Sequence, residues 1–312
     1  MSKMISTRTG FGNGLVELAG QRKDILTASA DTYRSFSLGG FVEKYPDRYF
    51  EFGIAEQNML TASAAMASEG YCVFCVGYSP FLSMRALEQM RTFIAYPNLN
   101  VKVAAGLSGL SGDTDGVTHQ GTEDIGIVRT IPNMNLLCPA DAVSAKAFVK
   151  IAADIEGPVY LRLGRGATPV LYEENQVFEF GKAIKVREYG KCAAVIACGP
   201  CVGEAALAAD QLREEGIGVT VLDMHTIKPL DKEGILESCA DADSVITVED
   251  GSIYGLGSAV AETLLENRLS PRNFQSLGIT SFGTAGTLPE LLNFFGLDAQ
   301  GIAESIRKLQ RK

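Results

Sequence analysis

The feature that most constrains the fold of this chain is a repeated alternation of short apolar, β-rich runs with helical stretches. In the first half the expected strands are 24–28, 49–52, 71–76, 101–105, 135–138 and 159–163, and the expected helices are 12–19, 55–68, 81–94 and 142–154. Strands that are almost continuously apolar are buried on both faces, as in a parallel sheet covered by helices. The pattern therefore predicts an α/β chain whose first domain, residues 1–168, is a doubly wound parallel sheet.

A polar stretch without helical periodicity, residues 169–190, interrupts this pattern and is expected to be a linker. A second and smaller α/β domain is then expected over residues 191–312. Its expected strands are 193–197, 219–222, 245–248 and 274–278, and its expected helices are 202–215, 257–267 and 299–309.

Composition excludes several classes of partner. The chain has 28 Lys and Arg against 37 Asp and Glu, a net charge of −9, which argues against nucleic acid or an anionic membrane. No run approaches the roughly 18 apolar residues of a membrane span, and the first 14 residues lack the apolar core of a secretory signal. Seven cysteines scattered through apolar stretches indicate reduced thiols, so we expect a cytoplasmic protein.

One expected helix carries no charge over residues 57–68, where Ala, Ser and Thr dominate. A helix without a polar face is normally buried on all sides, which favours a subunit interface, the alternative being a central helix of a monomer. Glu56 opens this helix. Read alone it is a first-turn carboxylate favoured by the helix dipole, but a carboxylate that enters a dry interface has a raised pKa and can share a proton with a ligand nitrogen.

A glycine-rich segment, residues 106–121, follows an expected strand and contains Asp113, Asp115, His119 and Gln120. Loops at the carboxyl ends of parallel strands are where α/β sheets bind ligands. The spacing does not fit a calcium loop. A structural role is the commonest one for a lone histidine, but the glycines and the neighbouring amide favour a functional role for His119.

The other candidate motifs give weaker evidence of a function than the glycine-rich segment does. The pair Cys72 and Cys75 lies in an apolar strand, and the pair Cys198 and Cys201 flanks a Gly-Pro turn, so both favour a structural role over redox or zinc chemistry. For His225 we also expect a structural role. No glycine fingerprint for a dinucleotide or Walker motif is present. Two arginines that end an expected strand, Arg162 and Arg165, suit phosphate contacts.

Four motifs in the chain are similar to those of a known family. They are YFEFGIAEQNM (49–59), YSPFLSMRALEQMR (78–91), DGVTHQG (115–121) and YLRLGRG (160–166). In this order they resemble the C-terminal portion of transketolase and of its relative 1-deoxyxylulose-5-phosphate synthase. The resemblance covers nearly the whole chain, and it implies a pyrimidine-binding domain over residues 1–168 followed by the C-terminal domain of the family.

The resemblance implies thiamine diphosphate as cofactor. Glu56 matches the glutamate that hydrogen-bonds a ring nitrogen of the cofactor's pyrimidine and promotes its activation. Phe81 matches an aromatic residue that packs on the pyrimidine ring, with Tyr78 beside it. Asp31 resembles an aspartate near the thiazolium ring.

Substrate residues are implied in the same way. His119 and Asp115 match residues that contact oxygens of the donor sugar, with His119 among the catalytic residues. Arg165, Arg8 and Ser35 match a phosphate site. The chain departs from the family at three positions. Leu107 stands where transketolase carries a histidine, Met84 stands where it has an aromatic residue, and the synthase's arginine is missing near Ser108. The last departure argues against the synthase.

The chain lacks the GDG motif with which the family holds the diphosphate and Mg²⁺, and no metal ligands are expected in it. The resemblance therefore implies one subunit of a two-chain transketolase, whose partner carries the diphosphate domain in an α2β2 assembly. Its expected reaction moves a two-carbon glycolaldehyde unit from a ketose phosphate to an aldose phosphate. The alternatives are the β subunit of a 2-oxoacid dehydrogenase E1, a catalytically silent scaffold subunit, and a nucleotide-binding protein, which the failed fingerprint disfavours.

Overall fold

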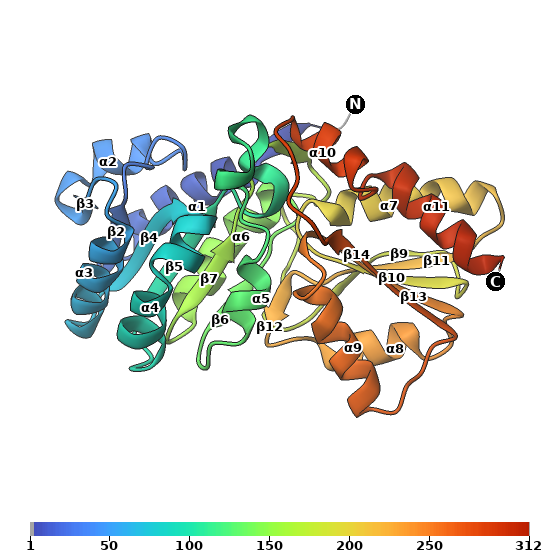
Figure 1. Cartoon of the computed structure of the whole chain (residues 1–312). Coiled ribbons are helices and arrows are strands. Elements are labelled where there is room, and N and C mark those ends of the chain that lie inside the picture. The colour runs from blue at the N-terminus through green and yellow to red at the C-terminus, as the bar shows by residue number, and fades with distance from the viewer. Residues whose placement is uncertain (1–2, 312) are drawn as a thin grey trace.

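Two sheets lie side by side in the computed structural model, which describes residues 3–311 (Figure 1). The first sheet has seven strands in the order β12-β6-β7-β5-β4-β2-β3, and the second has five in the order β14-β13-β10-β11-β9. Strands β1 and β8 form a separate antiparallel pair.

The elements that precede the second sheet are β1 (Met4–Ser6), α1 (Thr7–Gln21), β2 (Ile25–Ser29), α2 (Gly39–Lys44), η1 (Pro46–Arg48), β3 (Tyr49–Glu51), α3 (Glu56–Ser68), β4 (Cys72–Tyr78), η2 (Phe81–Arg85), α4 (Leu87–Gln89), η3 (Met90–Ala95), β5 (Val101–Gly106), η4 (Gly109–Asp115), η5 (Val117–His119), α5 (Asp124–Arg129), β6 (Asn135–Leu137), α6 (Ala142–Asp154), β7 (Val159–Arg162) and β8 (Ala167–Pro169). The remaining elements are β9 (Ile184–Glu188), β10 (Ala193–Ala197), α7 (Cys201–Glu214), β11 (Val219–Asp223), β12 (Thr226–Lys228), α8 (Lys232–Cys239), β13 (Ser244–Ser252), α9 (Leu256–Glu266), β14 (Asn273–Ile279), α10 (Leu288–Phe294) and α11 (Ala299–Gln310).

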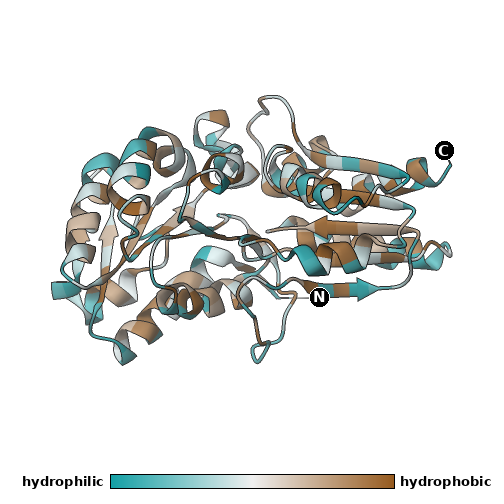
Figure 2. Ribbon diagram, turned by 90° about the horizontal axis from the view of Figure 1, so that it is seen from below, coloured by the Kyte–Doolittle hydropathy of each residue, from teal (hydrophilic) through white to brown (hydrophobic). Residues whose placement is uncertain are grey.

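Both sheets are parallel apart from one edge strand each. Within the first, β3, β2, β4, β5, β7 and β6 run parallel, and within the second so do β14, β13, β10 and β11. Every residue of β2, β5, β10 and β11 is buried. Figure 2 shows mostly apolar strands inside, with polar residues on the outer helices. The predicted α/β fold with a larger sheet followed by a smaller one is confirmed.

The antiparallel edge strands were not predicted. Strand β9 lies in the segment that we expected to be a linker and pairs with β11 of the second sheet. Strand β12 comes from the second half of the chain but pairs with β6 of the first sheet. Each is short or half-exposed, so its sequence lacks the continuous apolar run that marks a central strand. Strand β12 thus ties the second half of the chain to the first sheet, whereas β9 extends the second sheet.

Two expected helices differ from the prediction. Helix α1 begins at Thr7 rather than residue 12, because the Ser6 hydroxyl caps it by accepting from the Arg8 amide at 3.3 Å. The segment expected as one helix over 81–94 consists of two π-helical turns around a short α-helical turn. Turns of π-helix are rare in proteins overall, and those that occur are often found at functional sites.

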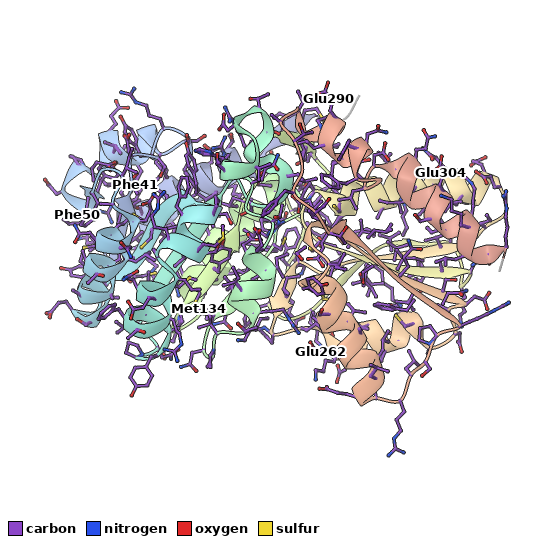
Figure 3. All side chains as sticks on the ribbon, viewed as in Figure 1. Phe41, Phe50, Met134, Glu262, Glu290 and Glu304 are labelled. Atoms are coloured by element: carbon purple, nitrogen blue, oxygen red, sulfur yellow. The ribbon has the colours of Figure 1, made fainter. Side chains whose placement is uncertain are left out.

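The uncharged helix, α3, is buried on one side only. Met59, Leu60 and Ala64 pack into the core, whereas Gln57 and Thr61 are exposed. The alternative of a central monomer helix is therefore wrong, because the chain leaves an uncharged helix face uncovered. Phe50 lies close by on β3, at the outer edge of the first sheet (Figure 3). Within residues 3–311 no helix is long and apolar enough to cross a membrane.

Candidate active site

The predicted site residues gather at one edge of the first sheet. Asp31 follows β2, Glu56 follows β3, Tyr78 ends β4, and Arg165 follows β7. The loop with Asp115 and His119 follows β5. These strands are parallel neighbours, so their carboxyl ends meet at the same edge, where α/β sheets bind ligands.

Glu56 lies in the first turn of α3 and is 3% exposed. Its Oε2 accepts a hydrogen bond from Nη1 of Arg85 at 3.0 Å. The guanidinium of Arg85 also lies over the ring of Phe81, 4.2 Å from its centroid. One half-exposed arginine thus contacts both a buried carboxylate at a helix N-terminus and an aromatic ring.

Three aromatic rings form the wall of the site. The His119 imidazole meets the ring of Phe81 at 5.3 Å and that of Tyr78 at 6.1 Å between centroids. Phe81 and Tyr78 contact each other at 6.2 Å. The hydroxyl groups of Tyr78 and Ser35 are 3.1 Å apart. The structure therefore brings together four predicted site residues, Ser35, Tyr78, Phe81 and His119, from three separate stretches of the sequence.

The charged residues form a second group beside this wall. Arg165 Nη1 donates to Asp115 Oδ2 at 2.7 Å. Burial lowers the pKa of Arg8, and the charge of Arg165 lowers it further. The Arg8 Nε is buried without a hydrogen-bond partner among the described residues. Two arginines with a free donor suit an anion such as a phosphate.

Backbone geometry shapes the surroundings of these side chains. Asp31 adopts a left-handed conformation, with φ at 56°, and its N–H donates to Glu51 Oε1 at 2.8 Å. The glycine-rich segment folds into two 3₁₀ turns, η4 and η5.

A cavity of about 230 Å³ lies beside the site. Met84 and Pro80 line it on one side, and residues 281–283 of the second half line it on the other.

Arg162 is not available for phosphate, contrary to the expectation from the sequence. Its side chain is 2% exposed and forms ion pairs with Asp124 and Asp250. Arg162 is the last residue of β7 and points into the protein, whereas Arg165 lies beyond the strand and is half-exposed.

Sequence reasoning assigned no role to three residues that lie at the site. Arg85 lies four residues after Phe81, but its contact with Glu56 depends on the π-helical turn, and no sequence pattern predicts such a turn. Asp113 lies near Arg8 and Arg165, and burial raises its pKa. Ser79 stands between Tyr78 and Pro80 in the quoted motif and could have been named as the anchor of that turn.

The cysteines and His225 behave as expected. Burial raises the pKa of the Cys72 thiol to about 11 and that of Cys75 to about 12, which makes both unreactive. His225 packs against Phe148 and Phe178, and burial lowers its pKa to about 4. These residues belong to the core.

The site suits one half of thiamine diphosphate. A buried carboxyl group can share its proton with a nitrogen of the pyrimidine ring, and aromatic side chains can pack on the faces of that ring. For the diphosphate half, no cluster of three or more metal-ligating side chains occurs in residues 3–311.

Comparison with known proteins agrees with this division. Residues 3–170 match the family model for the transketolase pyrimidine-binding domain, and residues 181–302 match the model for the transketolase C-terminal domain. A putative transketolase C-terminal section of Methanocaldococcus jannaschii is 40% identical over 98% of this chain and 96% of its own. One of the subunits of an apulose-4-phosphate transketolase from Phocaeicola vulgatus is 39% identical over 100% of this chain and 99% of its own.

A solved structure is similar over its full length. It is described as a split gene transketolase, an inactive β4 tetramer, and it has a TM-score of 0.89 with 37% identity over 99% of both chains. Both domains, the relatives of equal length and the fold thus point to one conclusion. The chain belongs to the thiamine-diphosphate-dependent transketolase family and matches its pyrimidine-binding and C-terminal domains.

Proposed function

We propose that this chain is the C-terminal subunit of a two-chain transketolase that moves a two-carbon glycolaldehyde unit from a ketose phosphate to an aldose phosphate. The observation that carries the proposal is the meeting of Glu56, the three site rings and Arg165 at one sheet edge. The buried carboxylate and the aromatic rings suit the pyrimidine of the cofactor, and the charged residues beside them suit a donor sugar and its phosphate.

Each group has a separate task in this proposal. Glu56 holds a proton at its carboxyl oxygen against the pyrimidine, while Tyr78 and Phe81 orient that ring. Thiamine diphosphate, when bound, supplies the nucleophilic carbon that accepts the two-carbon unit. Asp115 and His119 orient the sugar hydroxyl groups, and Arg165, Arg8 and Ser35 hold its phosphate. Asp31 lies at the same edge and is assigned to the thiazolium side.

A partner chain completes the site. It would hold the diphosphate and Mg²⁺, for which residues 3–311 offer no ligand cluster. The uncharged outer face of α3 supports an interface there, and so does Ile54, which is 73% exposed beside Glu56. A relative of the same length is described as an inactive β4 tetramer, which fits a chain that requires an N-terminal subunit in an α2β2 enzyme.

The described cysteines are all unpaired, which supports a reducing, cytoplasmic setting.

The test uses this chain co-expressed with an N-terminal transketolase subunit. Arg165→Ala should raise the KM for phosphorylated donors by about 10- to 100-fold, the value of a charge-assisted hydrogen bond, and spare hydroxypyruvate. Arg307→Ala is the matched control, because Arg307 also pairs with a carboxylate, Glu215, but in the second domain. Equal losses on both donors would remove Arg165 from the phosphate site. Consumption of a 2-oxoacid with no ketose phosphate turnover would favour the E1 β alternative.

A further inference from the structure

A buried cluster of charges joins the second domain to the candidate active site. Arg162, at the end of β7, donates through Nε to Asp124 Oδ1 at 3.0 Å and through Nη1 to Asp250 Oδ1 at 2.5 Å. Asp124 opens α5, and Asp250 lies in β13 of the second sheet (Figure 1). All three side chains are at most 2% exposed.

Asp124 extends this cluster into the wall of the site. Its Oδ2 accepts from the Ser79 hydroxyl at 3.0 Å and from the Tyr160 hydroxyl at 3.3 Å. Ser79 stands directly between Tyr78 and the turn that carries Phe81. The position of Asp124 therefore fixes the junction between the strand that ends at Tyr78 and the turn that carries Phe81.

Asp250 also supports the glycine-rich loop from behind. At Gly109, where φ is +58°, a Cβ atom would lie 2.2 Å from Asp250 Oδ2. At Gly121 a Cβ atom would lie 2.4 Å from Ser79 Oγ. The Ser252 N–H, two residues after Asp250, donates to the Thr122 carbonyl at 2.7 Å. The loop that carries Asp115 and His119 is thus clamped between Ser79 and the end of β13.

Stability alone does not account for this cluster. It places Asp124, Asp250 and the neighbouring Glu249 around one arginine, and burial raises the pKa of Glu249 to about 7. Arg162 Nη2, Asp250 Oδ2 and Glu249 Oε2 have no hydrogen-bond partner among the described residues. A buried ion network of this kind contributes little stability compared with apolar packing, whereas its fixed directions specify geometry.

We propose that Asp250 is a positioning residue of the active site. Through Arg162 and Asp124 it holds Ser79, and by direct contact it holds the glycine-rich loop, so the second domain sets the mutual orientation of Tyr78, Phe81 and His119. The consequence for cofactor affinity rests on the proposed function, but the geometric claim does not.

The chain contains its own reporters for a test, since it has only two histidines. His119 lies against Tyr78 and Phe81, and His225 lies against Phe148 and Phe178. Ring contacts make the NMR signals of both imidazoles sensitive to small displacements. Asp250→Asn, in the full-length chain, should shift the His119 signals and leave those of His225 in place.

A matched control reverses this pattern. Asp223 is a second fully buried carboxylate of the second sheet, and it accepts from the Tyr172 hydroxyl at 2.6 Å. Tyr172 packs on Phe178, which packs on His225. Asp223→Asn should therefore shift His225 and leave His119. Arg162→Lys is the second variant, because a lysine keeps the charge but cannot reach both carboxylates with a rigid fork, and it should reproduce the His119 shift.

The functional readout is the Kd for thiamine diphosphate in the two-chain complex. Asp250→Asn should raise it about 3- to 30-fold, the range for residues that act through a network, and Asp223→Asn should not. Unmoved His119 signals in both Asp250→Asn and Arg162→Lys would overturn the proposal, and so would equal displacement of both histidines in either variant. A selective His119 shift without cofactor binding in any variant, wild type included, would sustain the positioning role while refuting the proposed function.

Discussion

Arg85 offers the sharpest test of how the cofactor is seated. Its guanidinium pairs with Glu56 at 3.0 Å and covers the ring of Phe81 at 4.2 Å. The proposed function puts the pyrimidine ring against these same two groups. The cofactor must therefore displace Arg85, and the contacts of Arg85 oppose binding.

The size of this effect follows from the two contacts. The arginine is 47% exposed, so its ion pair is worth about 0.2–1 kcal/mol. The cation–π contact adds about 0.5–1 kcal/mol. Together they amount to about 0.7–2 kcal/mol, so Arg85→Ala should lower the Kd for thiamine diphosphate by about 3- to 30-fold.

The assay is equilibrium dialysis of the two-chain complex, with bound cofactor measured as thiochrome fluorescence. Arg91→Ala is the control, because Arg91 is an exposed arginine on the same segment. It should leave the Kd unchanged. A Kd that stays the same or rises in Arg85→Ala would show that the arginine does not compete with the cofactor, and the seating between Glu56 and Phe81 would have to be abandoned.

Two further predictions concern catalysis and stability. Glu56→Gln should lower turnover by about 10²- to 10⁴-fold, as expected for loss of an acid–base group. The free energy of unfolding, measured in urea, should fall by only about 0.5–2 kcal/mol, since the amide oxygen still accepts from Arg85. Wild-type turnover in this variant would refute the role of Glu56. Burial raises the pKa of Asp223 to about 7, so the native state keeps a proton that the unfolded chain releases near pH 4. Asp223 therefore adds stability at low pH that is lost as the pH rises from about 4 to 7, by up to about 4 kcal/mol. Urea titrations of Asp223→Asn should show a less negative slope of unfolding free energy against pH in this window than wild type, and identical slopes would contradict the assignment.

Much of the fold could be predicted from local pattern. Strands such as β2 and β5 are mostly apolar and proved buried at every position, because helices cover both faces of a central parallel strand. The polar side chains that they contain, Thr27, Ser29 and Lys102, are buried as well. Site residues such as Glu56 and His119 lie where parallel strands end, so the same pattern placed them at one edge. Their proposed tasks came from the motifs and await the experiments above.

Tertiary structure alone decided which distant residues meet. Arg85 reaches Glu56 across 29 positions, and Arg162 reaches Asp250 across 88. Strand β12 belongs to the second half of the sequence but pairs with β6 of the first sheet. The physical reason is that a local pattern determines which face of an element is buried, whereas the residue that covers this face depends on the packing of elements far apart in sequence. An arginine at a strand end can therefore be a buried anchor, like Arg162, or an exposed rim residue, like Arg165, and only its neighbours in space distinguish the two.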